Sequence, residues 1–316
     1  MIDRTRLPGT PEPMHRWEGF HGVTIAGDSW GDSEGPLVLL QHGGGQTRHA
    51  WKNTGRRIGD LGYHTVAMDA RGHGDSDWAP DGAYGQNVMV EDLQCVIAAL
   101  GGKRPALVGA SMGGGVSLVA VGEDRIDATA LVLVDIAPGI EASGAAKIQA
   151  FMDQRPEGFE SLEDVANSIS AYQPHRPRPA TLSGLAKNVR LGSDGKYYWH
   201  WDPAYRAGRR DLDKRRTRLE ACALKLKLPT LLVRGEFSDV LTEEGARRFL
   251  ELCPHSEYAN VSGAAHMVAG DENDAFARSA IDFLQRAVPI GGRPAQPPHE
   301  LHPPPESPVT EIHDVP

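Results

Sequence analysis

The pentapeptide Gly109-Ala110-Ser111-Met112-Gly113 constrains this chain most, because the runs on either side of it differ in structural character. An apolar run at 105–108 precedes it, and small and aliphatic residues at 114–120 follow it. The pattern predicts a strand, a turn too tight for side chains at the glycines, and a helix. Such a turn lifts the serine hydroxyl clear of the sheet, so Ser111 is the predicted nucleophile. The alternative is a chance match in a loop of a chain with 36 glycines.

Two later strand ends supply candidate partners for this serine. Asp239 lies in the loop after the apolar run 228–234, and His266 lies in the loop after a short strand at 258–261. The carboxyl ends of parallel strands meet at one edge of a sheet, so we expect Ser111, Asp239 and His266 to converge there. In that triad the histidine acts as general base, and the aspartate orients the imidazole and stabilises its protonated form.

Each partner also has a plainer interpretation. His266 is one of 13 histidines and fits an ordinary surface loop, while Asp239 fits a solvated turn before the next helix. A second acid is available, because Asp135 directly follows the apolar strand 131–134. Asp239 is the predicted triad acid, and Asp135 is the alternative.

A glycine-rich loop offers hydrogen-bond donors to a developing oxyanion. His42-Gly43-Gly44-Gly45 follows the apolar run 36–40. In this type of site one N–H comes from the residue after the nucleophile and another from such a loop, so Met112 and Gly44 form the predicted oxyanion hole. Met112 also opens a helix, whose N-terminus favours an anion. A phosphate-binding loop is disfavoured, because the Lys-Ser/Thr ending and the Gly-x-Gly-x-x-Gly spacing are both missing.

Taken together, these motifs resemble the α/β-hydrolase fold, and in particular its capped branch of epoxide hydrolases, haloalkane dehalogenases and meta-cleavage C–C hydrolases. The matching segments are His42-Gly43, Asp69 to Ser76, Gly109 to Gly114, Gly235 to Asp239 and Gly263 to His266. Epoxide hydrolases and haloalkane dehalogenases of this branch have aspartate at the nucleophile position, whereas this chain has Ser111. The resemblance therefore implies the fold and a triad rather than an epoxide or haloalkane substrate.

The alternation of strands and helices predicts a mostly parallel sheet covered on both faces. With the resemblance, we expect an α/β-hydrolase fold with eight strands, helices on both faces and a cap inserted between strands 6 and 7. The expected core is 15–138 and 225–288, and the expected cap is 139–224. Residues 289–316 are rich in proline and lack periodicity, which predicts a disordered tail.

Composition narrows the possible partners. A formal net charge of −9 argues against nucleic acid. The three cysteines are far apart and form no disulfide framework or metal-binding pattern, so no cofactor or metal is expected. No run of about 20 apolar residues predicts a membrane span, and the N-terminus lacks an apolar signal core, which predicts a cytoplasmic protein. The sequence does not indicate the oligomeric state.

The predicted activity is hydrolysis of carboxylic esters or lactones, with small to medium, fairly apolar substrates and an acyl-enzyme intermediate. The alternatives are C–C bond hydrolysis, perhydrolysis and a slow-turnover ligand sensor on the same fold. C–C hydrolysis would require a cap residue that recognises an acid, for which Arg176, Arg178 and Arg190 are candidates. In the cap, adjacent Tyr198 and Trp199 lie on a predicted strand, so only one of them should face the pocket.

Overall fold

The computed structural model describes residues 4–174, 182–207, 211–266 and 273–292. Its main element is an eight-stranded sheet with the order β11-β10-β7-β6-β4-β5-β3-β2. The antiparallel hairpin of β2 and β3 forms one end of the sheet. The other six strands, β4, β5, β6, β7, β10 and β11, are parallel to one another. In chain order the strands are β2 (His15–Glu18), β3 (Thr24–Trp30), β4 (Leu37–Gln41), β5 (His64–Met68), β6 (Ala106–Ala110), β7 (Ala130–Val134), β10 (Thr230–Gly235) and β11 (Glu257–Val261).

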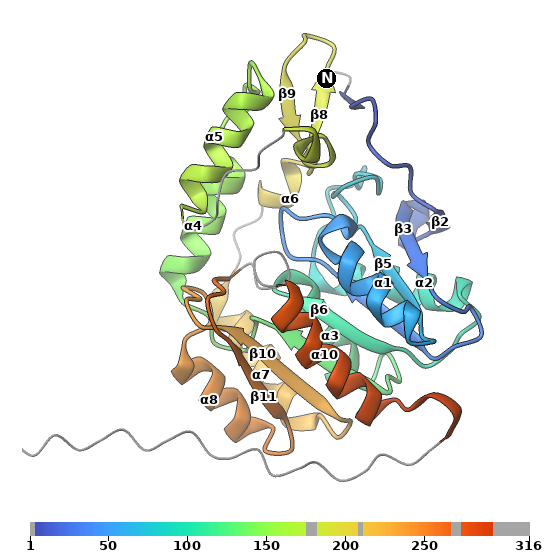
Figure 1. Cartoon of the computed structure of the whole chain (residues 1–316). Helices are drawn as coiled ribbons and strands as arrows, with labels where there is room; N and C mark the ends of the chain where they lie inside the picture. Colours follow the sequence, from blue (N-terminus) through green and yellow to red (C-terminus); the bar gives the residue numbers. More distant parts are fainter. Residues whose placement is uncertain (1–3, 175–181, 208–210, 267–272, 293–316) are drawn as a thin grey trace, which may run out of the picture.

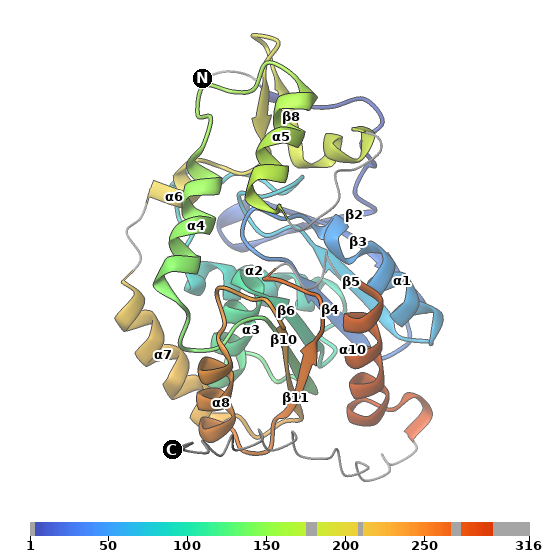
Figure 2. The ribbon, with the colours of Figure 1, turned by 60° about the vertical axis from the view of Figure 1, so that its left-hand side comes forward.

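Alternate residues of the central strands bury opposite faces of the sheet, as the pleat requires. On β4, Leu37 and Leu39 join one core, while Val38 and Leu40 join the other. The first core is covered by α2 (Gln86–Ala99), α3 (Met112–Gly122), α7 (Leu212–Lys225) and α8 (Glu243–Leu252). The second is covered by α1 (Lys52–Asp60) and α10 (Asn273–Ala287), and Figure 2 shows the two helix layers on opposite sides.

The chain between β7 and β10 leaves this pattern and builds a cap over the carboxyl ends of the strands (Figure 1). Its described elements are α4 (Ala142–Asp153), α5 (Leu162–Tyr172), η3 (Ser183–Asn188), β8 (Val189–Gly192), β9 (Tyr197–Trp199) and α6 (Ala204–Ala207). β8 and β9 pair as the expected antiparallel hairpin. The N-terminal strand β1 (Arg4–Arg6) adds to this hairpin, so the arm of the chain is part of the cap sheet.

The position of α7 differs from the expected cap boundary at residue 224. This helix lies against α3 of the core, and a Cβ added at Gly122 would approach the Cβ of Cys222 to 2.4 Å. Arg218 on α7 also donates to Glu123, which follows α3, at 2.7 Å. Helix α7 therefore belongs to the covering layer of the sheet. The eight-stranded, mostly parallel fold and its insertion between the sixth and seventh strands agree with the expectation.

Most of the expected tail, 293–316, lies outside the described residues. Before it, Ile290–Gly292 forms the short helix η4. The three cysteines are free thiols, with Cys222 and Cys253 buried.

Candidate active site

Ser111 occupies a strained turn between β6 and α3. Its backbone has φ 46° and ψ −104°, a conformation that residues with a side chain rarely adopt. The neighbouring glycines make the turn possible, because a Cβ at Gly109 would lie 2.5 Å from the Gly113 backbone and one at Gly113 would lie 2.6 Å from the Gln41 side chain. The strain presents the hydroxyl at the carboxyl end of the central strand, as the sequence predicts.

Hydrogen bonds from both neighbouring strands hold this turn. The Ser111 N–H donates to Val134 O at 3.0 Å, and the Gly113 N–H donates to His42 O at 3.2 Å. Behind it, the Ser117 hydroxyl donates to Gly113 O at 2.9 Å. The strained conformation is therefore fixed by the ends of β4 and β7.

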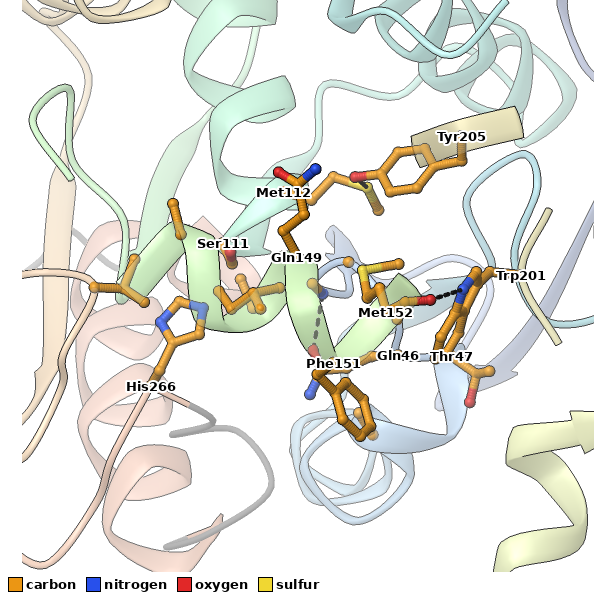
Figure 3. Close-up of a pocket in the computed structure, with 18 of the residues that line it drawn as sticks. Gln46, Thr47, Ser111, Met112, Gln149, Phe151, Met152, Trp201, Tyr205 and His266 are labelled. Atoms are coloured by element: carbon orange, nitrogen blue, oxygen red, sulfur yellow. Dashed lines mark hydrogen bonds between the residues drawn. The ribbon is translucent and has the colours of Figure 1, made fainter. Parts of the chain in front are cut away.

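His266 meets an acid, but this acid is Asp135. The Nδ1 atom of His266 lies 2.6 Å from Oδ2 of Asp135. Both groups are shielded from solvent, with side chains 8% and 1% exposed. Because Nδ1 is engaged by the carboxylate, Nε2 is the ring nitrogen left to face the pocket, where Figure 3 shows the imidazole on the same side as Ser111.

The prediction that Asp239 contacts His266 is wrong. The Asp239 carboxylate is 47% exposed and pairs with Lys147 Nζ at 2.8 Å. The residue before it turns inward instead, and the Ser238 hydroxyl donates to Asp135 Oδ2 at 2.5 Å. Gly235 N–H also donates to Asp135, at 3.1 Å. The loop after β10 thus supports the acid rather than supplying it.

The sequence signal for Asp135 was its place directly after a fully buried strand. In the structure its φ is 51°, a left-handed turn that aims the side chain across the sheet edge. The same strand-to-turn change occurs at Ser111, one strand away. A positive φ at an aspartate is not visible in sequence, whereas the loop of Asp239 matched a family pattern.

The glycine-rich loop after β4 lies directly beside the nucleophile. A Cβ added at Gly43 would be 3.4 Å from the Ser111 Cβ. The Gly43 N–H is used by Gln46 Oε1, at 2.8 Å, so the next N–H along the loop is that of Gly44. Met112 belongs to the first turn of α3, where N–H groups have no acceptors within the helix. The loop that contains Gly44 and the helix turn that contains Met112 therefore both adjoin Ser111, and the oxyanion hole stays a prediction.

A buried histidine fixes the start of this loop. Ala70 N–H donates to Nε2 of His42 at 2.9 Å, and so Nδ1 carries the proton that is shared with Gly43 O at 2.8 Å. Burial lowers the pKa of His42, more than neighbouring Asp69 raises it. His42 is therefore a neutral brace and does not take part as a base.

A second neutral histidine ties the cap to the same loop. His200, just after β9, accepts from the Gly74 N–H at Nδ1 (2.8 Å) and donates from Nε2 to Gly45 O (3.2 Å). Burial lowers its pKa well below the usual value. No sequence motif marks His200, because its role depends on contacts among three separate segments of the chain.

Tyr205, on α6 of the cap, lies beside Gly44 and Met112, the residues predicted to supply the oxyanion donors. Its hydroxyl lies 3.1 Å from the Met112 sulfur, and a Cβ at Gly44 would be 3.4 Å from it. Figure 3 shows its ring pointing toward Met112. The cap therefore touches the oxyanion region directly.

Ser111 and His266 open into a cavity of about 1180 Å³ between cap and core. Its apolar walls include Phe151, Met152, Trp199 and Trp201, several of which appear in Figure 3. Tyr198 points the other way, and its hydroxyl donates to Asp194 at 2.7 Å. The expected alternation of these adjacent rings is thus confirmed, with Trp199 facing the cavity.

The described part of the chain contains no cluster of three histidine, cysteine or acidic side chains suited to a metal ion. Among its helices, none has both the length and the apolar character needed to cross a bilayer. The polar groups that the structure brings together at the cavity are a serine, a histidine and a buried carboxylate.

Comparison with known proteins agrees with this geometry. A sequence profile described as the alpha/beta hydrolase fold matches residues 36–272. Esterase Rv0045c of Mycobacterium tuberculosis is 28% identical over 280 residues, 86% of this chain and 90% of that protein. A 3-hydroxybutyrate-oligomer hydrolase of Cupriavidus necator is 26% identical over 276 residues, 81% of this chain and 89% of that protein.

A solved structure of E-2-(acetamidomethylene)succinate hydrolase superposes with a TM-score of 0.76 and covers 90% of this chain and 100% of that one. At 23% sequence identity this likeness concerns the fold alone. The chain belongs to the alpha/beta hydrolase fold family. It is a hydrolase, and esterases stand among its similar relatives.

Proposed function

We propose that this protein is a serine hydrolase that cleaves carboxylic esters through a triad of Ser111, His266 and Asp135. The observation that carries the proposal is the strained Ser111 in the same cavity as a histidine whose Nδ1 is held by a buried carboxylate. The relatives named esterase and oligomer hydrolase support the same reaction class.

The residues then act in two half-reactions. His266 Nε2 takes the proton of the Ser111 hydroxyl as the oxygen attacks the ester carbonyl, and Asp135 stabilises the resulting imidazolium. The N–H groups of Gly44 and Met112 stabilise the oxyanion. Collapse releases the alcohol, which receives the proton from His266, and leaves an acyl group on Ser111. Water activated by His266 then hydrolyses this acyl-enzyme and releases the acid.

The apolar walls favour esters or lactones with a hydrocarbon part that fills the cavity. C–C hydrolysis has less support, because Arg190 is directed to Asp75 (3.0 Å) and to Gly74 O, away from the cavity. The other candidate arginines, Arg176 and Arg178, lie outside the described residues. For these reasons ester cleavage is the activity to test first.

The experiment compares wild type with Ser111→Ala on p-nitrophenyl esters and with a fluorophosphonate probe. Loss of a triad nucleophile costs on the order of 10⁶ in kcat in a well-studied protease, so turnover should vanish while the fold persists. The probe should label wild type at Ser111 and leave the alanine variant unlabelled. Activity of the variant within about tenfold of wild type would refute the nucleophile, and a single turnover without steady-state release would indicate a ligand sensor.

A further inference from the structure

The cavity wall carries charge of the sign opposite to that of the whole molecule. The chain has a formal net charge of −9, yet among the described residues the cavity is lined by the lysine and arginine side chains Lys52, Lys187 and Arg215 and by one carboxylate, Asp211. Asp211 already caps helix α7, where it accepts from Lys214 N–H at 3.0 Å and pairs with Lys214 Nζ at 3.5 Å. The wall therefore presents an excess of positive charge to anything that enters.

Two of these cations come from opposite sides of the cavity seam. Lys52 and Asn53 begin helix α1 of the core, and Lys187 and Asn188 end helix η3 of the cap. All four line the cavity that contains Ser111. Two Lys-Asn dipeptides, one from each part of the protein, thus combine ammonium groups with amide donors.

The described residues offer neither lysine a compensating acid. Among the described residues, neither Lys52 nor Lys187 has a carboxylate partner within ion-pair distance, although many surface lysines and arginines do. Lys187 is half-buried, and burial followed by the charge of Lys52 lowers its pKa. Neighbouring His49 adds no competing charge near neutrality, because burial, followed by the charge of Arg48, lowers its pKa to about 4.

We propose that Lys52 and Lys187, with Asn53 and Asn188, form a subsite for an anionic group, a carboxylate or a phosphate, at the end of the ester substrate remote from the scissile bond. This inference rests on the proposed ester hydrolysis at Ser111 and deepens it. A bound anion would replace the repulsion between the two ammonium groups with two attractions. Because one lysine belongs to the core and the other to the cap, the substrate would also join the two parts over the reacting ester.

The arrangement suits a ligand that is apolar in its middle and charged at its end. The aromatic wall near Trp199 accepts the hydrocarbon part, and lysine binds carboxylate and phosphate as a flexible point charge without demanding one planar geometry. An anion at the subsite leaves the triad unchanged, so the charge should affect recognition of the substrate rather than the chemistry at Ser111.

The test uses two acyl series of p-nitrophenyl esters that differ only in terminal charge: hemi-esters of dicarboxylic acids from succinate to suberate, and the same compounds capped as methyl esters. At the chain length that spans the cavity, wild type should prefer the anionic ester by about tenfold in kcat/KM. Hydrogen bonds to charged groups predict that Lys187→Met lowers kcat/KM for that ester by about 10- to 100-fold. The same variant should change the methyl-capped ester by less than about threefold.

Matched variants make the result specific. Lys52→Met should weaken the same preference, and Lys187→Arg should retain most of it. Lys196→Met, on the cap but paired with Glu160 and away from the cavity, should leave both series unchanged. Competitive inhibition of the capped ester by an alkyl carboxylate and by an alkyl phosphate of equal length then tells which anion the subsite favours.

Equal or better turnover of the capped ester at every chain length by wild type would overturn the inference, and so would an anionic preference that persists in both methionine variants. Those outcomes leave ester hydrolysis intact. If wild type hydrolyses neither series, the proposed function fails, and the subsite assignment fails with it.

Discussion

The two aspartates near the site, Asp135 and Asp239, differ in backbone conformation and in exposure to solvent. Asp135 turns through a positive φ at the end of β7 and receives hydrogen bonds from Gly235 N–H and from the Ser238 hydroxyl. These donors leave its Oδ2 aligned on His266 in a solvent-shielded place. Asp239, four residues beyond the end of β10, reaches solvent and Lys147 instead. The buried carboxylate of Asp135 therefore contacts the histidine, whereas the exposed carboxylate of Asp239 forms a surface ion pair.

Substituting each aspartate by asparagine tests which carboxylate supports catalysis. Asp135→Asn removes the charge that orients His266 and stabilises its protonated form, so kcat should fall by about 10⁴. Asp239→Asn removes only an exposed ion pair, for which a loss of about 0–1 kcal/mol in stability is expected, and kcat should stay within about threefold of wild type. The measurement is steady-state hydrolysis of p-nitrophenyl acetate by both variants.

Circular dichroism of the two variants provides the control for folding. A severe loss of kcat in Asp239→Asn together with near-normal turnover by Asp135→Asn would reverse the assignment.

Among the elements, strand β9 directs its two adjacent aromatic rings to opposite faces. Trp199 lines the cavity and stacks on Trp201 with ring centroids 4.8 Å apart, whereas Tyr198 lies under the Arg4 guanidinium at 4.0 Å. Trp199→Ala should change KM and the preferred acyl length more than kcat on p-nitrophenyl acetate, since a short ester does not reach the ring. Tyr198→Ala should keep the chain-length profile.

Thermal unfolding of the same two variants completes the comparison. Tyr198→Ala should lower Tm through loss of its ring and hydroxyl contacts. An unchanged acyl-length profile in Trp199→Ala would show that this strand does not set substrate range.

The N-terminal strand β1 joins the cap to the core. It pairs with β8, while Arg6 reaches Asp75 of the core at 3.0 Å and Arg4 covers Tyr198 of the cap. Cross-strand pairs and a cation–π contact are each worth up to about 1 kcal/mol. Deleting residues 1–7 should therefore cost about 2 kcal/mol and lower Tm by about 3 °C.

Limited proteolysis should also cut the truncated protein sooner within the cap than it cuts the full chain. An unchanged Tm and cleavage pattern would mean that β1 adds no stability to the cap.

Local sequence patterns predicted most elements but not their long-range partners. The stripe of Leu93, Val96, Ile97 and Leu100 and the buried run of β6 are periodic, so helix α2 and the central strands could be read directly. The polar segment Arg4–Arg6 carries no such signal, and its pairing with β8 depends on residues almost 190 positions away. The many charged residues of helix α7 indicate a solvent-exposed helix. Its packing on α3 depends on the small residue Gly122.

The candidate site shows the same difference between residues fixed by local motifs and residues fixed by long-range contacts. Ser111, Met112 and Gly44 follow from short motifs because each is fixed by its own turn. The carboxylate that reaches His266 depends on tertiary packing: Ser238 turns inward, where its hydroxyl donates to Asp135 and accepts from Leu241 N–H at 3.0 Å, and Asp239 is left facing solvent. Sequence reasoning supplied both aspartates, and tertiary packing selects between them.

For the molecule as a whole, the buried histidine His200 links the cap to the core beside charged pairs such as Arg190 with Asp75, and a second buried histidine, His42, lies within the core at the start of the glycine-rich loop. His42 and His200 are both fully buried, and burial lowers the pKa of each. His200 accepts from Gly74 N–H, so a proton added at Nδ1 would replace an acceptor with a second donor facing that N–H. Acid should therefore weaken the contact between the cap and the core loop that contains Gly74.

The direction of the pH effect follows from where protons bind. Above about pH 6.5 these histidines are neutral in both the folded and the unfolded chain, so they make no pH-dependent contribution. Below it the unfolded chain binds protons that the folded chain resists, and the free energy of unfolding decreases until the pH reaches the lowered folded-state pKa. The slope is at most about 1.4 kcal/mol per pH unit for each histidine.

His200→Gln tests this at one site, because a glutamine amide offers an acceptor for Gly74 N–H and a donor for Gly45 O but does not titrate. Urea unfolding at pH 5, 6, 7 and 8 should show a shallower loss of stability below pH 6.5 in the variant than in wild type, by up to about 1.4 kcal/mol per pH unit. His255→Gln, at an exposed position, is the matched control and should follow the wild-type slope. Parallel curves for wild type and His200→Gln would show that His200 does not contribute to acid sensitivity. A shallower slope would identify this buried ring as one origin of the loss of stability in acid.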